Sequence, residues 1–334
     1  MKVKTKELLD KLNLIKPALY TKGILEQADH FLFTGNEIVT YNDRFSIRVP
    51  FKTEEKFSVP GQEFLKVISG LNEEEFDLSF EDNQVMIQAG NTKSGISTFQ
   101  GSLFELIEPM ISEKDKWKSL PDDFNNAAFL SMFSVSKDVS RGVMAHLSVN
   151  NDEVASSDDL RISMYKLKSS LKSSFLLPLT SVIELVKISM TEFLLKDTWV
   201  HFRNKDRTVF SSRVLLDTFL NYQEFFDVQG DSVQLPDKLK AVVDGVTIFA
   251  EGDFDLDKKI TVTIDKNKII CKGEKEKGWI EKSMEFKYKG KKLSFLVNPI
   301  FFSQVLDKST EVIIGENTAL FKSGDFSHVM VLPV

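Results

Sequence analysis

The feature of this sequence that most constrains its fold is a motif that occurs three times, roughly 120 residues apart. Each copy is a short apolar strand that ends in a proline or an Asn-Pro pair: Phe57–Pro60, Phe175–Pro178 and Phe295–Pro299. Apolar residues follow at the spacing of one helix face. Solenoid repeats are only about 20–50 residues long, whereas roughly 120 residues is the size of a domain. The motif therefore predicts one domain built three times.

Further segments recur in the same order in each copy. Helix candidates with one apolar face span residues 5–19, 61–72, 127–139, 179–190, 236–250 and 298–309. Hairpin candidates, in which apolar and polar residues alternate around Asn, Asp or Gly, span residues 31–41, 76–89, 146–156, 199–209, 260–271 and 311–322. This order predicts an α+β chain of three similar domains, each with two helices packed on antiparallel strands.

Polar stretches mark the expected domain boundaries. Ser112–Asp123 is charged and contains a proline, and Asp227–Ser232 is polar and contains a glycine. We therefore expect domains at residues 1–117, 118–229 and 230–334. A chance alignment of common hairpins is the alternative interpretation, but the strand–proline–helix motif in register with both hairpins favours the repeat.

Composition describes an ordinary globular chain. Its 334 residues are 42% hydrophobic and 28% charged, which is enough for two or three cores. The single cysteine, Cys271, lies inside an expected strand and cannot form an internal disulfide, which is typical of a reducing compartment. We interpret it as a small buried apolar residue. No apolar run reaches the length of a signal peptide or a membrane span, so we expect a cytoplasmic protein without membrane contact.

The distribution of charge favours a weak nucleic-acid role. The net charge of the chain is −6. The helix candidates carry a net charge of +4 when the first is counted over residues 2–19 and the third over residues 127–141, which leaves −10 for the rest of the chain. Most of the excess comes from residues 2–19, where five lysines face two acidic residues. Solvated helix faces explain the same numbers equally well.

A search for catalytic chemistry returns little. The four histidines all lie in or beside expected strands, without metal-binding spacing, and one cysteine excludes a cysteine-rich zinc site. Only His146 with Asp158 or Asp159 offers a loose acid–base pair, and a turn explains the paired aspartates better. No metal or cofactor is expected, and a non-enzymatic role is favoured.

Three segments resemble the bacterial-type DNA sliding clamp, the beta subunit of DNA polymerase III. Arg141–Met144 with Val154–Ile162 is similar to the family's second-domain pattern, although one extra residue precedes Arg161 and a Gly-His pair is missing. Gly278–Phe301 resembles the third-domain run. Val329–Val334 resembles the family's closing segment without its last two residues. The residue count is below that of typical bacterial members, which suggests a diverged version; a phage source is one hypothesis.

The resemblance implies a ring-forming DNA clamp fold with helices on one face of curved antiparallel sheets. Two chains would join head to tail, with twelve helices lining a hole that holds duplex DNA without reading its sequence. Such a ring is a processivity factor for DNA replication, and its implied partners are double-stranded DNA, a DNA polymerase, a clamp loader and a second copy of the chain. The alternatives left open are a three-domain scaffold or binding protein that forms no ring and, less favoured, an enzyme.

The resemblance and the helix positions also suggest site residues. The expected DNA-facing residues are Lys4, Lys11, Lys22, Lys137, Arg141, Lys187 and Lys238. The expected cleft for partner peptides, between domains two and three, comprises Met144, Arg161, Ile162, Asn298, Phe301, Met330, Val331, Leu332, Pro333 and Val334. Without the resemblance, most of the apolar residues in this set would be assigned to a core.

Overall fold

The computed structural model describes the chain except residues 20–26, 100–110, 113 and 334. By their contacts the residues form two units. Unit 1 combines Met1–Asp122 with Ile183–Leu215, and unit 2 combines Asp123–Val182 with Leu216–Val334. The three-domain division expected from the sequence stays a prediction. Lys22 and Val334, named above as site candidates, lie outside the described residues.

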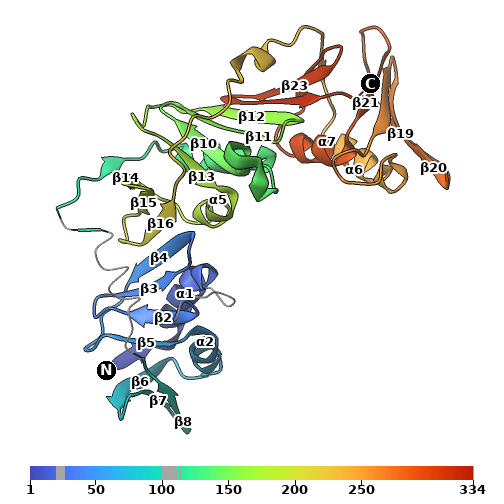
Figure 1. The fold of residues 1–334 in the computed structure, drawn as a ribbon. Coiled ribbons are helices and arrows are strands. Elements are labelled where there is room, and N and C mark those ends of the chain that lie inside the picture. The colour runs from blue at the N-terminus through green and yellow to red at the C-terminus, as the bar shows by residue number, and fades with distance from the viewer. Residues whose placement is uncertain (20–26, 100–110, 113, 334) are drawn as a thin grey trace. The chain divides into compact units, whose positions relative to one another are not determined.

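Unit 1 consists of two antiparallel sheets with helices α1 (Thr5–Ile15) and α2 (Gly61–Ser69). The larger sheet has the order β5-β2-β3-β4-β16-β15-β14-β9. Its strands are β5 (Phe57–Pro60), β2 (His30–Phe33), β3 (Glu37–Tyr41), β4 (Phe45–Pro50), β16 (Val209–Arg213), β15 (Trp199–Arg203), β14 (Glu192–Lys196) and β9 (Lys118–Ser119). The smaller sheet, β1-β6-β7-β8, comprises Lys2–Lys4, Glu75–Glu81, Gln84–Ala89 and Thr92–Ser97, and carries the N-terminus on its β1 edge (Figure 1).

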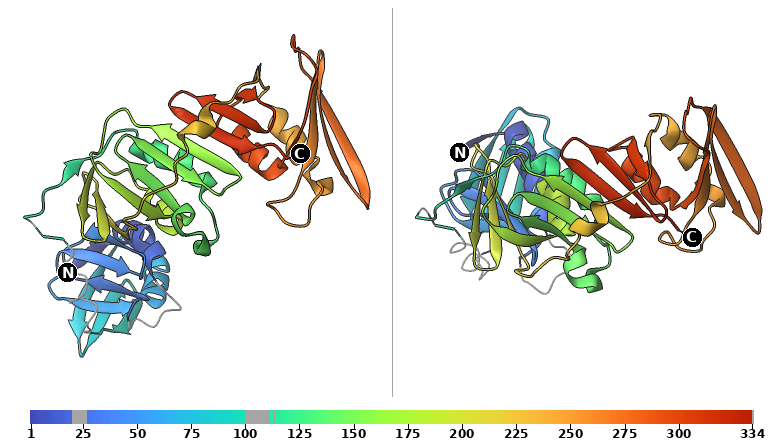
Figure 2. Two further views of the ribbon diagram at one scale, coloured as in Figure 1. Left: turned by 45° about the horizontal axis from the view of Figure 1, so that its top comes forward. Right: turned by 90° about the horizontal axis from the view of Figure 1, so that it is seen from above.

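Unit 2 is also built from one eight-stranded and one four-stranded antiparallel sheet. The larger has the order β13-β10-β11-β12-β24-β23-β22-β17. Its strands span Ser174–Pro178, His146–Asn150, Glu153–Ser157, Arg161–Lys166, Phe326–Val331, Thr318–Ser323, Glu311–Ile314 and Asp231–Gln234. Figure 2 shows the red C-terminal strands continuing the green strands into one sheet. The smaller sheet, β20-β19-β18-β21, comprises Gly278–Glu285, Lys268–Lys275, Ile260–Asp265 and Leu293–Val297.

The two eight-stranded sheets have the same strand order. Each sheet starts with the strand of the proline motif, which is followed by three strands connected by hairpins. One central strand pair then joins this half to a second half, which also contains hairpin-connected strands. That pair is β4–β16 in unit 1 and β12–β24 in unit 2. Each four-stranded sheet has the order of one half of such a larger sheet, so the repetition expected from the sequence is present in the topology.

The helices are shorter than the sequence pattern predicts. The candidate at residues 236–250 forms α6 (Leu239–Asp244) and a separate 3₁₀ turn, Thr247–Phe249. Gly245 ends α6, since glycine is a poor helix former, and the Thr247 hydroxyl donates to the Val243 carbonyl at 3.0 Å. The candidate at residues 127–139 is likewise α4 (Phe124–Ser131) followed by the 3₁₀ turn Met132–Ser134.

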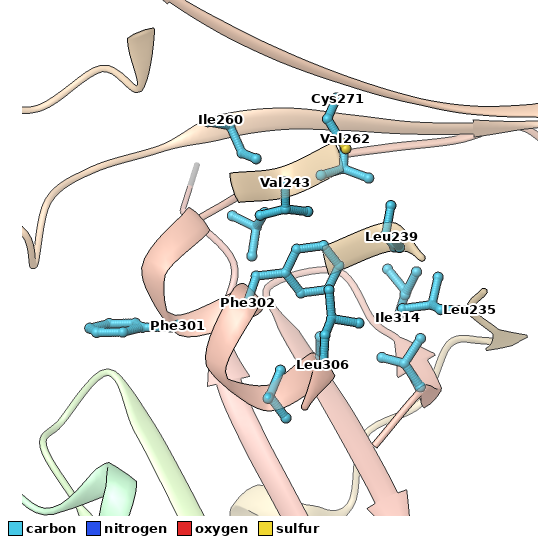
Figure 3. Packing of buried hydrophobic residues seen from close by; sticks show 14 of the residues in the cluster. Leu235, Leu239, Val243, Ile260, Val262, Cys271, Phe301, Phe302, Leu306 and Ile314 are labelled. Atoms are coloured by element: carbon cyan, nitrogen blue, oxygen red, sulfur yellow. The ribbon is translucent and has the colours of Figure 1, made fainter. Parts of the chain in front are cut away.

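The apolar core of the C-terminal part of unit 2 lies between α6, α7 (Pro299–Leu306) and the flanking sheets. Figure 3 shows Phe302 of α7 pointing toward Val243 and Leu239 of α6 and toward the strand residues beyond them, while Phe301 points the other way. Cys271 is fully buried in this core, and burial raises the pKa of its thiol to about 12. Its expected role as a small buried residue is confirmed.

Three of the four histidines are buried and bonded to serine. His30 Nδ1 lies 3.1 Å from Ser58 Oγ, His201 Nδ1 lies 2.7 Å from Ser211 Oγ, and His328 Nδ1 lies 2.9 Å from Ser163 Oγ. Burial lowers the pKa of all three imidazoles, that of His201 to about 4. All three are therefore neutral structural groups near neutral pH.

Candidate functional site

Charged, polar and aromatic side chains gather around Arg161 in unit 2. This residue begins β12, directly after the turn that connects it to β11, and only 6% of it is exposed. Its guanidinium Nε donates to Asp158 Oδ2 at 2.9 Å, and Nη1 donates to Gln304 Oε1 of α7. Burial lowers the pKa of Arg161, and the ion pair with Asp158 opposes that shift. A buried charge of this kind must be paired to be tolerated.

Two aromatic rings enclose the same guanidinium. Its central carbon lies 4.0 Å from the centroid of the Phe301 ring and 5.3 Å from that of Phe133. Cation–π contacts of this kind strengthen when the cation is removed from water. In Figure 3, Phe301 extends from α7 in a different direction from Phe302. Arg161 therefore ties the β11–β12 turn to α7.

Asn298 positions the start of α7. Its side-chain Oδ1 accepts from the backbone N–H groups of Ile300 and Phe301 at 3.0 and 3.2 Å, which caps the helix. Its Nδ2 donates to the carbonyls of Asp255 and Leu256 at 2.8 and 3.3 Å. The residue is 4% exposed, and both side-chain atoms are already engaged. Asn298 therefore holds the chain near Asp255 beside the Arg161 cluster.

The remaining cleft candidates fall on different faces of the β12–β24 pair. Arg161 is opposite Met330, and Ile162 is opposite Val329. Because successive strand residues point to opposite faces, Ile162 and Arg161 do not share one. Met330 and Leu332 are 1% and 3% exposed and belong to the core cluster, whereas Val331 is 43% exposed. Met144 and Pro333 are half-buried.

Sequence reasoning missed three neighbours of Arg161. The Asp158 carboxylate is three residues away, a spacing that was available as a signal but was assigned to a turn. Gln304 and Phe133 reach Arg161 only through the fold, since they lie 143 and 28 residues away in the chain.

The expected DNA-facing cations differ in their surroundings. Lys11 pairs with Glu7 at 2.7 Å, Lys187 pairs with Glu184 at 2.8 Å, and Arg141 forms an ion pair with Asp159. The other three described residues are exposed: Lys4 precedes α1, Lys238 precedes α6, and Lys137 follows the 3₁₀ turn after α4. Their role in DNA binding stays a prediction.

The acid–base candidates are engaged in other contacts. Nδ1 of His146 lies 2.9 Å from the Gly142 carbonyl, and the two aspartates pair with Arg161 and Arg141. Within the described residues, no group of three or more His, Cys, Asp and Glu side chains could hold a metal ion. In the same part of the chain, no helix combines the length and the apolar character that crossing a membrane requires.

Comparison with known proteins gives matches in structure alone. No protein-family model and no curated protein matches the sequence. The DNA polymerase III subunit beta sliding clamp of Pseudomonas aeruginosa, bound to griselimycin, superposes with a TM-score of 0.85 at 14% identity, covering 100% of this chain and 99% of that one. The Helicobacter pylori beta clamp bound to a DNA ligase peptide gives 0.83 at 16%, with coverage of 100% and 99%. The Bacillus subtilis sliding clamp gives 0.82 at 14%, with 100% and 98%. The chain therefore has the α+β sliding-clamp fold, as the sequence resemblance predicted.

Proposed function

We propose that this chain is a sliding clamp, a non-enzymatic processivity factor that encircles duplex DNA in the cytoplasm and tethers a DNA polymerase and a clamp loader. The observation that carries the proposal is the arrangement of sheet edges. Each eight-stranded sheet is two four-stranded halves joined through one strand pair, β4–β16 or β12–β24. The two separate four-stranded sheets are the halves left over, one in each unit.

The strands at the free edges correspond to those that join elsewhere. Strand β20 has the same place in its four-stranded sheet as β4 and β12 have in their halves of the larger sheets. Strand β8 likewise has the same place as β16 and β24. Unpaired edges need to be covered. Pairing of β20 with β8 of a second chain would complete a third kind of eight-stranded sheet, and a repeated head-to-tail contact can close a ring. This assembly makes domains at 1–117, 118–229 and 230–334 equivalent around the ring.

We expect the ring to depend on apolar residues beside the β20 edge. Ile248 is 70% exposed in the 3₁₀ turn that contacts β20, and Trp279 is 64% exposed on β20 itself. The double substitution Ile248→Ser and Trp279→Ser should convert a dimer near twice 38.0 kDa to a monomer without loss of monomer stability, because neither side chain is buried in the chain. Light scattering across a concentration series measures this. The matched control, Leu216→Ser with Phe225→Ser, removes two other exposed apolar residues and should stay dimeric.

A native monomer at micromolar concentration would contradict a self-closing ring. It would instead favour the alternative proposal, a three-domain scaffold that does not encircle DNA.

We expect the exposed helix-flanking cations to contact DNA phosphates. Substituting Lys4, Lys137 and Lys238 by serine should leave the dimer intact and lower the slope of duplex affinity against salt by about 0.9 for each phosphate that the protein no longer neutralises. Retention on nicked circular plasmid, with release on linearisation, distinguishes encirclement from surface binding. The control replaces Lys166, Lys168 and Lys322, three exposed lysines outside the expected DNA-facing set, and should change the slope less. Equal slopes for both variants would remove these residues from the DNA interface.

The Helicobacter pylori clamp is bound to a DNA ligase peptide. We expect a partner peptide of this chain to bind beside the β11–β12 turn that Arg161 holds, where the Val331 N–H donates to the Leu160 carbonyl at 2.8 Å. Among the described residues of the expected cleft, Val331 offers the cleanest test because it is 43% exposed. Val331→Ser should weaken binding of the cognate polymerase's C-terminal peptide about tenfold with little change in stability, since a buried aliphatic anchor contributes about 1.5–3 kcal/mol. Calorimetric titration measures it, with Phe225→Ser as the control. Deleting residues 332–334 would not test the cleft, because Leu332 is in the core.

A further inference from the structure

Lysines and two aromatic rings gather at one end of the four-stranded sheet in unit 2. The segment Phe286–Lys292, which reads Phe-Lys-Tyr-Lys-Gly-Lys-Lys, connects β20 to β21. The Asp265–Lys268 turn between β18 and β19 lies at the same end, since Lys268 is opposite Glu285 and Ile264 is opposite Leu293. Two segments of the chain thus meet there.

Backbone hydrogen bonds hold the two segments together. The Phe286 N–H donates to the Asn267 carbonyl and the Tyr288 N–H to the Lys266 carbonyl, each at 3.0 Å. This joint surface, which we name the lysine–aromatic patch, carries six exposed lysines: Lys266, Lys268, Lys287, Lys289, Lys291 and Lys292. The backbone hydrogen bonds therefore hold the two lysine-bearing segments side by side at this end of the sheet.

The patch is positive on a chain that is negative overall. Its six lysines face three nearby carboxylates, Asp265, Glu285 and Asp231, for a net charge of +3, against −6 for the whole chain. Burial, with a smaller contribution from Asp231, raises the pKa of Tyr288, which therefore stays a neutral phenol. A patch of this sign attracts polyanions.

The aromatic rings lie between the lysines. Alternation along the segment keeps Lys287 and Lys289 exposed while Phe286 and Tyr288 are half-buried. The two ring centroids are 6.2 Å apart, with planes within 17° of parallel. A cavity of about 350 Å³ opens beside them, lined by residues 286–290 and by Asp231–Gln234 of β17. Partly exposed rings beside a hollow offer a stacking surface as well as charge.

We propose that the lysine–aromatic patch binds single-stranded nucleic acid, with the lysines on phosphates and the rings against unpaired bases. Ring stacking favours this ligand over duplex, whose bases are already stacked, and every base has a face to offer. Lysine is a compact point charge that binds phosphate without geometric selection. This site is additional to the proposed encirclement of duplex DNA and does not depend on it.

The test is fluorescence anisotropy of a labelled oligothymidylate 12-mer with the full chain at low salt. Substituting Lys287, Lys289 and Lys291 by serine should weaken binding at least tenfold. It should also lower the salt slope by about 0.7 for each phosphate of the single strand that is no longer neutralised. The matched control replaces Lys166, Lys168 and Lys322, exposed lysines elsewhere in the same unit, with the same change in net charge. Equal affinity of the two variants would overturn the proposal.

Two further variants separate stacking from charge and from the hole. Tyr288→Leu keeps apolar packing but removes the ring, and should weaken the oligothymidylate at least fivefold, whereas Tyr288→Phe should not. The variant at Lys4, Lys137 and Lys238 should retain binding of the single strand; its loss there would place the binding site on the DNA-facing residues and overturn the proposal. An oligoglutamate of the same charge serves as the comparison ligand. If it binds as tightly as the oligothymidylate and is weakened equally by Tyr288→Leu, the patch binds acidic protein segments and the proposal is overturned. Unchanged thermal unfolding of each variant excludes loss of fold.

Discussion

Arg161→Met is expected to destabilise unit 2 by about 3–5 kcal/mol, the cost of breaking a buried ion pair from one side. The methionine side chain fills much of the same space between Phe301 and Phe133. It leaves the Asp158 carboxylate, whose side chain is 9% exposed, without its guanidinium, and Gln304 without its donor. Urea unfolding followed by circular dichroism measures the destabilisation. Because the guanidinium joins the β11–β12 turn to α7, peptide binding near Val331 should fall as well.

A second variant distinguishes an unpaired charge from weakened packing. In Arg161→Met with Asp158→Asn, no buried charge remains, and the asparagine oxygen can still accept from the backbone N–H groups of Leu160 and Arg161. Most of the stability should return. A loss of less than about 1 kcal/mol in the free energy of unfolding of Arg161→Met would mean that the Arg161–Asp158 ion pair is effectively solvated. It would then not be the centre of the site.

Acid should destabilise the chain between pH 6.5 and 4. The imidazole of His201 has its pKa lowered from 6.5 to about 4, first by burial and then by Arg48 and Lys196, against a smaller opposing effect of Asp115. In this window the unfolded chain binds the proton and the folded chain does not, so stability that is present above pH 6.5 is lost as pH falls. One pKa unit corresponds to about 1.4 kcal/mol, which gives about 3 kcal/mol for His201. His328 adds to the loss, because burial and the charge of Arg161 also hold its pKa well below 6.5.

Substitution of the histidine tests this assignment. His201→Asn can keep a hydrogen bond to Ser211 but has no titrating group, so its stability should depend less on pH between 6.5 and 4 even if it is lower at pH 7. Urea midpoints at half-unit pH intervals measure the slope. The control is His146→Asn, because half-buried His146 lies in the other unit and its Nδ1 lies 2.9 Å from the Gly142 carbonyl. A slope unchanged by His201→Asn and changed by His146→Asn would reverse the assignment.

The architecture was predictable because the repeat is written in local patterns. Proline after an apolar strand and alternation around Asn or Asp turns depend on a few neighbouring residues, and all six expected hairpins are present. Helix ends were less predictable. The helical spacing of apolar residues continues through Gly245, but α6 ends there and a 3₁₀ turn follows. This turn packs against β19 and β20, a contact that the spacing alone does not predict.

The site was only partly predictable for a related reason. The importance of Arg161 came from a resemblance, and its partner Asp158 could have been paired with it from spacing alone. Gln304 and Phe133 could not, since their contacts with Arg161 depend on how α7 and the 3₁₀ turn after α4 pack against β12 within unit 2. Residues 330–334 were all expected to belong to the peptide cleft. The strand alternation instead divides them between core and surface: Met330 is 1% exposed and Val331 is 43% exposed.

The recurring strand pair at the centre of each large sheet has a mechanical consequence. Pairs β4–β16 and β12–β24 are tethered by the covalent chain, so after a transient opening each strand remains at a high effective concentration of its partner. In the proposed assembly, the equivalent pairing of β20 with β8 of another chain has no such tether. If all these strand pairs have similar hydrogen bonds, the pairs between two chains would stay open longest after they separate. A ring of this kind would therefore open at an interface between chains, and a clamp loader would need to hold only that interface open to admit DNA.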